Sequence, residues 1–346
     1  MFDSWKRRTK VVLAATSAAS LLAIGVGLGA SLNATGDVRS VKSGQLGALG
    51  WYSNTYSRLA QISGMVFDGT SLWAGGYGYL AKIDVNTGLP LGTTLVSSTS
   101  PISAVAFDGT YVWTANSTAS SVSKVNNGTV VGTYALPTNA QPQALAFDGT
   151  NLWTANGGTA SVSKINVSTG AVIGTYAVGT APRGLVFDGT SLWVANYYSN
   201  TLSKVNISTG AVTATTTLPT VPGPTALAFD GWYVWSVNRL GGSVSKVNVG
   251  SGLVANTYPL LAGSEPCAIA FDQPGYSTSA APQPDRSTYM WVTGCLSNSV
   301  SVFNTETGAR VANYPTGERP SAVVFDGTNV WVGNYWGSSI TKIRSR

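Results

Sequence analysis

Residues 143–181 read QALAFDGTNLWTANGGTASVSKINVSTGAVIGTYAVGTA and form the clearest copy of a unit that fills most of the chain. The first segment alternates small and large residues, with Ala144 and Ala146 on one face and Leu145 and Phe147 on the other, as in a β-strand. Turn signals divide the stretch into four such segments, namely Asp148-Gly149, Gly157-Gly158 and Ser168-Thr169-Gly170. The unit therefore predicts four short antiparallel strands.

The unit recurs seven times, marked by a Phe-Asp pair that Gly-Thr usually follows and, in most copies, by a Trp six residues after the Phe. The phenylalanines are Phe67, Phe107, Phe147, Phe187, Phe229, Phe271 and Phe325, at spacings of 40, 40, 40, 42, 42 and 54 residues. One four-stranded propeller blade has this size. We predict an all-β, seven-bladed β-propeller in one domain, residues 35–346, with blades starting near 64, 104, 144, 184, 226, 268 and 322.

The seventh unit lacks a fourth strand, because the chain ends at Arg346 soon after its third strand, Ser339 to Ile343. A strand-like stretch from about Leu46 to Tyr56 precedes the first unit. We expect this N-terminal strand to complete the seventh blade and close the ring, which removes an open sheet edge.

The N-terminus carries four basic residues, Lys6, Arg7, Arg8 and Lys10, before an uncharged apolar run from Val11 to about Leu32. This order is typical of a signal peptide, although the run is long enough for an uncleaved membrane anchor. We predict that residues 1–34 are a signal peptide or an anchor, with residues 11–32 as a membrane tether. In both cases the remainder is secreted or extracytoplasmic, in the periplasm or at the cell surface.

Charge argues against nucleic-acid binding. Residues 1–34 hold four bases and one acid, a net +3, so the formal charge of +6 leaves +3 for the rest of the chain. The remaining basic residues are scattered singly, without the basic cluster and stacking aromatics that nucleic-acid surfaces use. We expect no nucleic-acid partner.

Residues 193–212, WVANYYSNTLSKVNISTGAV, resemble the YVTN-type repeat of bacterial extracytoplasmic propellers and, more loosely, NHL-repeat and streptogramin-lyase-like propellers. The resemblance runs from about Gly64 to Arg344 and implies the propeller fold. Its members range from surface-layer and binding proteins to enzymes. The lyase-like enzymes imply a histidine base with acidic and metal-binding partners, yet this chain has no histidine. No catalytic residue is therefore carried over, and we expect a binding module rather than an enzyme.

Other chemistry is scarce as well. Two cysteines without histidine make a poor zinc site, and no acidic loop has calcium-site spacing, so we predict neither a metal nor a cofactor. Seven of the fourteen acids are the motif aspartates, which we interpret as turn formers. Six lysines share one repeat position, and we expect them to contact those aspartates: Lys82, Lys124, Lys164, Lys204, Lys246 and Lys342.

The candidate site is a rim of the ring, where connections between second and third strands meet those between blades. We predict that it binds cell-envelope polysaccharide or a protein, through Tyr197, Tyr198, Tyr335, Trp336, Asn196, Asn334, Arg183, Arg239, Glu265 and Glu318. One alternative is a lyase or hydrolase that uses Glu265 and Glu318 as an acidic pair. Another is a self-assembling surface-layer or filament subunit.

One blade departs from the repeat. It inserts residues 273–288 between the first and second strands, a loop that we place on the opposite rim. It also contains both cysteines, Cys267 at the start of its first strand and Cys295 just past its second. Antiparallel pairing brings these two strand ends together, so we predict a Cys267–Cys295 disulfide in an oxidising compartment.

Overall fold

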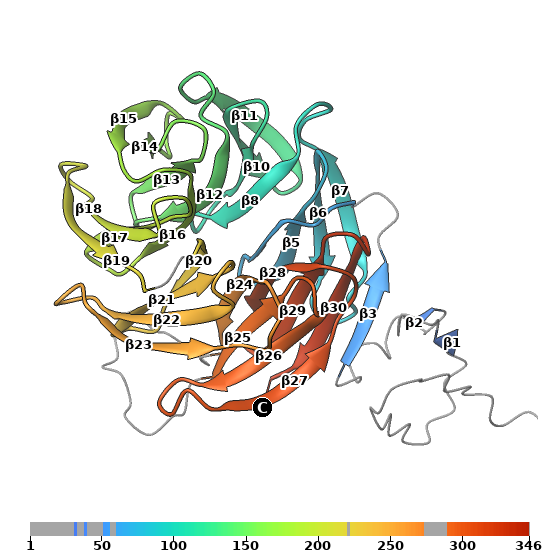
Figure 1. Cartoon of the computed structure of the whole chain (residues 1–346). Coiled ribbons are helices and arrows are strands. Elements are labelled where there is room, and N and C mark those ends of the chain that lie inside the picture. The colour runs from blue at the N-terminus through green and yellow to red at the C-terminus, as the bar shows by residue number, and fades with distance from the viewer. Residues whose placement is uncertain are drawn as a thin grey trace, which may run out of the picture.

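The computed structural model describes residues 60–219, 222–272 and 289–345, together with the backbone of β1 (Ser31–Leu32), β2 (Val38–Arg39) and β3 (Trp51–Thr55). Strands β1 and β2 pair in a small antiparallel ladder. The other strands form seven four-stranded antiparallel sheets arranged around a ring (Figure 1). None of the described residues is helical. The predicted all-β, seven-bladed propeller is confirmed.

The first strand of each blade lies innermost and contacts the first strand of the next blade, and β28 contacts β4 to complete the circle. These strands are β4 (Gly64–Phe67), β8 (Ile102–Phe107), β12 (Pro142–Phe147), β16 (Pro182–Phe187), β20 (Pro224–Phe229), β24 (Pro266–Phe271) and β28 (Pro320–Phe325). The second strands are β5 (Ser71–Gly75), β9 (Val112–Asn116), β13 (Asn151–Asn156), β17 (Ser191–Asn196), β21 (Tyr233–Asn238), β25 (Tyr289–Gly294) and β29 (Asn329–Asn334).

The third strands carry the recurring lysines. They are β6 (Tyr79–Asp84), β10 (Ser121–Asn126), β14 (Ser161–Asn166), β18 (Thr201–Asn206), β22 (Ser243–Asn248), β26 (Ser299–Asn304) and β30 (Ser339–Arg344). The outermost strands of the first six blades are β7 (Pro90–Leu95), β11 (Thr129–Ala135), β15 (Val172–Ala177), β19 (Val212–Thr217), β23 (Val254–Pro259) and β27 (Arg310–Pro315). The seventh blade takes β3 as its outermost strand.

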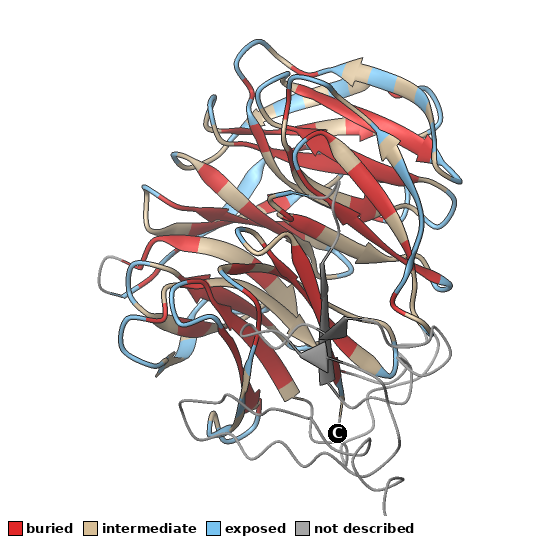
Figure 2. Ribbon diagram, turned by 90° about the vertical axis from the view of Figure 1, so that its right-hand side faces the viewer, coloured by how far each residue is buried: buried red, intermediate tan, exposed pale blue. Residues whose placement is uncertain are grey.

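The core lies between blades. Figure 2 shows buried residues along the middle strands of the blades and exposed ones in the connections and outer strands, and the innermost strands are mostly intermediate. Each apolar cluster draws on two neighbouring blades, as where Trp153 of β13 packs with Leu192 and Val194 of β17. Burying an indole in this way stabilises the pair of blades, and truncating one to alanine typically costs about 3–5 kcal/mol.

The strand pairing that closes the ring also tells its two rims apart. Strand β3 pairs with β30, with Trp51 opposite Ile343 and Thr55 opposite Ser339, so the predicted N-terminal closing strand is confirmed. The chain therefore enters the ring at the rim where β30 ends, which we call the chain-end rim. The opposite rim, called the open rim, carries the turns between second and third strands: residues 76–78, 117–120, 157–160, 197–200, 239–242, 295–298 and 335–338.

The lysines of the third strands join adjacent blades. Lys164 places Nζ 5.5 Å from the centre of the Trp153 ring and donates to the carbonyl oxygen of Ile207 in the next blade at 2.7 Å. Carbonyl oxygens of the next blade also accept from Lys124, Lys204, Lys246 and Lys342, whereas Lys82 donates to Asn127 Oδ1. These hydrogen bonds of the lysines thus go to the next blade, while Lys246 and Lys342 are also attracted electrostatically by the motif aspartates Asp230 and Asp326 of their own blades.

None of the described residues forms a helix with the length and apolarity needed to cross a membrane. The predicted tether, residues 11–32, lies outside the described residues except for β1. The insertion at residues 273–288 lies outside them as well.

Candidate binding site

One repeat position on the open rim carries large exposed apolar side chains in five consecutive blades. This position is the second residue after each second strand, and we call its five large members the apolar arc: Tyr198, Leu240, Leu296, Trp336 and Tyr77. Their exposed fractions run from 51% for Tyr77 to 67% for Tyr198. The two remaining blades carry Thr118 and Gly158 at this position. The arc therefore covers one side of the ring.

Sequence reasoning named Tyr198 and Trp336 as candidates but missed Leu240 and Leu296. The signal was available, because all of these residues follow the second strand by the same two positions. The backbone fixes them there: the amides of Tyr198 and Trp336 donate to the carbonyls of Thr180 and Glu318, each at 3.2 Å. Every arc hairpin is thus held against the connection that enters its own blade.

Arg183 belongs to β16, the innermost strand of the fourth blade, which is also the blade that carries Tyr198. Pro182 pairs with Asn196 and Gly184 with Ala195, so Arg183 is the extra residue of a β-bulge. The same bulge recurs in most of the other blades, so it belongs to the repeat, and in the fourth blade it sets the position of Arg183. The guanidinium carbon lies 3.8 Å from the centre of the Tyr197 ring.

Tyr197 is itself buried, and its ring meets that of Tyr198 edge-on, with centroids 5.1 Å apart. The fourth blade thus presents an arginine stacked on a buried tyrosine, with an exposed tyrosine beside it. Of the predicted residues of this blade, Arg183, Tyr197 and Tyr198 are brought together.

The seventh blade repeats this arrangement with different residues. The guanidinium carbon of Arg319 lies 4.5 Å from the Trp336 ring centre and 5.5 Å from that of Tyr335. Tyr335 donates its hydroxyl to Gln61 Oε1 of the first blade at 3.2 Å, which anchors the ring. Glu318 is exposed beside this group. A second arginine–aromatic group therefore stands three blades from the first.

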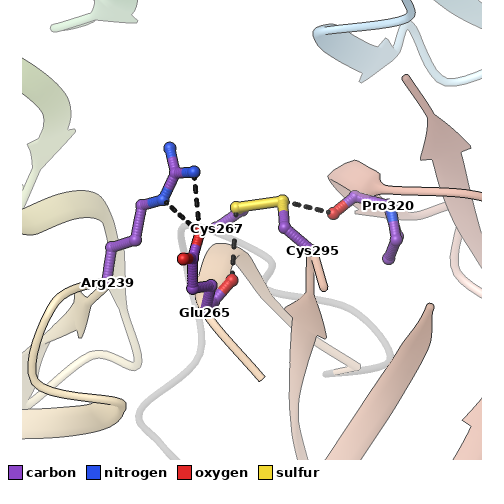
Figure 3. Close-up of polar contacts among 5 residues, drawn as sticks. All are labelled: Arg239, Glu265, Cys267, Cys295 and Pro320. Carbon is purple, nitrogen blue, oxygen red and sulfur yellow. Dashed lines mark hydrogen bonds and ion pairs between the residues drawn. A yellow bond between two sulfur atoms is a disulfide. The ribbon is translucent and has the colours of Figure 1, made fainter. Parts of the chain in front are cut away.

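Arg239 and Glu265 join the fifth blade to the sixth. Arg239 Nη2 lies 2.9 Å from Glu265 Oε2 in an ion pair, with both side chains partly buried (Figure 3). Among the described residues this is the one ion pair that the structure shows directly. Glu265 therefore has a cationic partner across the boundary between the two blades.

The cysteines form a disulfide on the same rim. Cys267 and Cys295 are bonded with an S–S distance of 2.07 Å and a Cα–Cα distance of 6.0 Å. Cys295 Sγ lies 3.1 Å from the carbonyl oxygen of Pro320, the first residue of the next blade (Figure 3). The disulfide thus stands between the ion pair and the seventh-blade group.

Asn196 and Asn334 correct the sequence interpretation. Both are fully buried, so neither amide reaches the surface. Asn196 Nδ2 donates to Thr201 Oγ1 and Ser203 Oγ, and Asn334 bonds its own blade in the same way, to Ser339 and Thr341. Their repeat position is polar because the amide ties the second strand to the third, not because it faces a ligand.

The described residues contain no group of three or more Cys, Asp or Glu side chains able to hold a metal ion. The open rim instead offers flat apolar surfaces and guanidinium groups. Such a surface can bind a ligand by stacking and hydrogen bonding.

No protein-family model and no curated protein matches the chain. Solved structures share its fold. Streptogramin B lyase aligns with a TM-score of 0.69 and 17% identity over 84% of this chain and 97% of that one. A catalytically inactive histidine-to-alanine variant of virginiamycin B lyase from Staphylococcus aureus, with quinupristin, gives 0.71 and 17% over 86% and 99%.

The hydrazine synthase of Kuenenia stuttgartiensis aligns with a TM-score of 0.68 and 18% identity, over 84% of this chain and 97% of that one. At such low identity these likenesses concern architecture alone. The chain is a seven-bladed β-propeller with the fold that streptogramin B lyase also has.

Proposed function

We propose that the protein is an exported, non-catalytic binding module whose open rim holds cell-envelope polysaccharide. The observation that carries this proposal is the apolar arc, an exposed side of the rim with no role in the repeat itself. Single exposed apolar side chains are ordinary, but five of them at one repeat position on one side of a rim are a plausible interaction surface. Tyrosine and tryptophan combine a flat apolar face with a polar edge, which suits the faces and hydroxyl groups of sugars.

Each exposed ring already has an aromatic or cationic neighbour before any ligand arrives. Tyr198 packs edge-on against buried Tyr197, and Trp336 lies beside Arg319. A ligand that stacks on such rings does not have to order them, so less entropy is lost on binding.

The position of the strand ends supports binding at the open rim rather than at the chain-end rim. Strand β3 starts and β30 ends at the chain-end rim. A tether in residues 11–32 would thus enter from that side and leave the open rim free for material outside the cell. The disulfide agrees with an oxidising, extracytoplasmic location.

A binding role is favoured over catalysis for two reasons. The chain has no histidine, whereas the name of the inactive lyase variant points to a histidine whose loss inactivates that enzyme. Glu265, one member of the acidic pair considered from the sequence, is paired with Arg239. A shared fold does not transfer an activity without its residues.

Self-assembly remains the second candidate, because the outer strands β7, β11, β15, β19 and β23 carry no charged residue. Uncharged edge strands favour pairing with another chain. Each of them also has a bulge, as at Ile173, which opposes such pairing. Sedimentation of the purified chain distinguishes the two candidates: a binding module stays monomeric as its concentration rises, and a subunit polymerises.

The test of polysaccharide binding compares Trp336→Ala and Tyr198→Ala with Trp232→Ala. Trp232 is a matched control, since it is 62% exposed in a turn of the chain-end rim. Co-sedimentation with insoluble envelope polysaccharide should be lost in the first two variants and kept in the third. All three should unfold within about 1 kcal/mol of the wild type, as surface substitutions do. Equal binding by all three variants would remove the open rim as the site.

A further inference from the structure

We infer that the ligand of the open rim is an acidic polysaccharide, recognised through its carboxylate groups by Arg183 and Arg319. The inference rests on the proposed function and adds the chemical class of the ligand. Its starting point is that the guanidinium carbons of both arginines lie over aromatic rings, 3.8 Å from the centre of the Tyr197 ring and 4.5 Å from that of the Trp336 ring.

An arginine that lies over a ring is attracted to the ring through its charge, and its N–H groups can still donate hydrogen bonds. Among the described residues, no protein acceptor takes a hydrogen bond from either side chain, and neither makes an ion pair. The planar fork of arginine matches the two oxygens of a carboxylate, and the charge strengthens both hydrogen bonds. Each of the two guanidinium groups is therefore available to donate hydrogen bonds to one carboxylate.

Arg239 shows what a satisfied arginine looks like on the same rim. Its guanidinium donates from both Nε and Nη2 to Glu265 Oε2, at 3.3 and 2.9 Å. This pair stands on the two blades between the Arg183 and Arg319 groups. On this rim Arg239 is paired with a carboxylate of the protein, whereas Arg183 and Arg319 have no carboxylate partner among the described residues.

Both guanidinium groups are held in place. Arg183 projects from a bulge, and the Tyr197 ring beneath it is confined by Gly223, where an added Cβ would lie 3.1 Å from Tyr197 Cε2. Beside Arg319, Tyr335 is tied to Gln61. Preorganised donors lose little freedom when they bind a carboxylate, which raises affinity.

A polysaccharide fits better than an acidic peptide. Each free guanidinium stands next to an exposed ring, Tyr198 or Trp336, so a sugar could stack its face while its carboxylate meets the fork. The described part of the open rim has no lysine and holds three arginines against two glutamates. A near-neutral rim gives little general attraction for acidic peptides, so selectivity has to come from the two forks.

The experiment measures binding of the full chain, in mild detergent, to two matched probes by calorimetry. One probe is an oligogalacturonate, and the other is the same oligomer with its carboxyl groups reduced to alcohols. We expect the acidic oligomer to bind at least about tenfold more tightly, as charge-assisted hydrogen bonds predict. Arg183→Gln and Arg319→Gln should each lose about tenfold, and Arg183→Lys nearly as much, because lysine lacks the fork.

Two further variants test the sign of the effect. Glu318→Gln should tighten binding of the acidic oligomer by about twofold or more, because a repelling carboxylate is removed. Arg310→Gln makes the same charge change as Arg183→Gln but starts from an exposed arginine of the chain-end rim, so it should leave affinity unchanged.

The outcomes separate this inference from the proposed function. Equal binding of the two oligomers, lost in Trp336→Ala, would overturn carboxylate recognition and keep a polysaccharide site. Tighter binding of polyglutamate than of oligogalacturonate would replace the polysaccharide with a peptide. If insoluble envelope polysaccharide also fails to bind, the proposed function itself falls.

Discussion

Trp291 donates its indole N–H to Asp272 Oδ2 at 2.9 Å, although 19 residues separate the two along the chain. In the six other blades the same bond spans five residues, at 2.6–2.7 Å. The inserted residues 273–288 therefore leave the bond intact. The Phe-Asp motif is a clamp that ties the turn after the first strand to the buried tryptophan of the second.

Asp188 should make the stability of the fold depend on pH in the acid range. Burial alone would raise the pKa of this carboxyl, but hydrogen bonds from Trp193, Ser191 and Thr190 outweigh burial and hold the pKa below its ordinary value of 3.8. A lowered carboxyl pKa gives stability that is complete above about pH 4 and is lost as pH falls through the folded-state pKa.

Asp188→Asn places an amide N–H against the indole N–H, which should cost about 1–3 kcal/mol at pH 7. Urea unfolding should show this difference shrinking below pH 4, as the wild type loses its own advantage. Glu306→Gln, an exposed acid of the same rim, serves as the control. A constant gap between Asp188→Asn and the wild type down to pH 2 would contradict the linkage.

The substitution Val194→Thr should not lower the stability of the fold, although threonine at other buried positions should. Asn196 Oδ1 is buried with no hydrogen-bond partner, whereas the equivalent atom of Asn156 accepts from Thr154 Oγ1 at 2.8 Å. Val194 occupies the place of Thr154, so Val194→Thr supplies the missing donor. Chemical denaturation should find this variant as stable as the wild type or up to about 1 kcal/mol more so.

The matched control is Val205→Thr, at a fully buried valine of the same apolar cluster. Burying a hydroxyl without a waiting acceptor there should cost about 1–3 kcal/mol. If both threonine variants lose the same stability, the Asn196 acceptor gains nothing from the new hydroxyl.

The disulfide occupies a place where three other blades use a serine, Ser63, Ser103 or Ser321. The hydroxyls of Ser103 and Ser321 donate to the first carbonyl of the next blade, at Pro142 and Ile62, each at 2.5 Å. Cys267 holds the equivalent position in the repeat. Replacing both cysteines opens a loop with a sequence separation of 28 residues, for which chain entropy predicts a loss of about 3–4 kcal/mol.

The double variant Cys267→Ser with Cys295→Ser should retain about 1 kcal/mol more than the double alanine variant, because Ser at 267 can restore the bond between blades. Thermal unfolding of both proteins, beside the wild type with and without reductant, measures the difference. Identical melting of the serine and alanine variants would leave no role for the hydroxyl.

Closure of the ring should depend on β3. Deleting residues 51–55 leaves the outer edge of β30 unpaired, and unpaired edges aggregate or unfold readily. We expect a lower melting temperature with loss of the monomer in sedimentation. A synthetic peptide of residues 46–56, added in trans, should restore both, whereas a scrambled peptide should not. A deletion variant that melts like the wild type would show that the ring closes without this strand.

The fold was predictable because its signals are local and repeated. Phe147, Asp148 and Trp153 lie within one hairpin, and seven copies reveal the period. The side-chain partners were less accessible, because they join different blades. Arg239 meets Glu265 across 26 residues, and Lys164 bonds Ile207 across 43. Such contacts depend on how blades pack, which the repeat period does not specify.

The candidate site was predictable only in part for the same reason. Exposed Tyr198 and Trp336 stood out as departures from the repeat, but buried Asn196 looked equally polar in the sequence. Its burial follows from two hydroxyl partners on the neighbouring strand, Thr201 and Ser203. Comparing the same position in all seven units would have added Leu240 and Leu296 to the site.

The hydrogen bond between the motif aspartate and the tryptophan indole lies at the chain-end rim in every blade. The contacts that stabilise the repeat and the proposed binding surface therefore occupy opposite ends of each blade. Hairpins on the open rim, such as residues 197–200, can then diverge or be exchanged without disturbing a clamp. The propeller is for this reason a modular scaffold: an engineer could graft new loops onto one rim, blade by blade, and ask each time only whether the added surface binds.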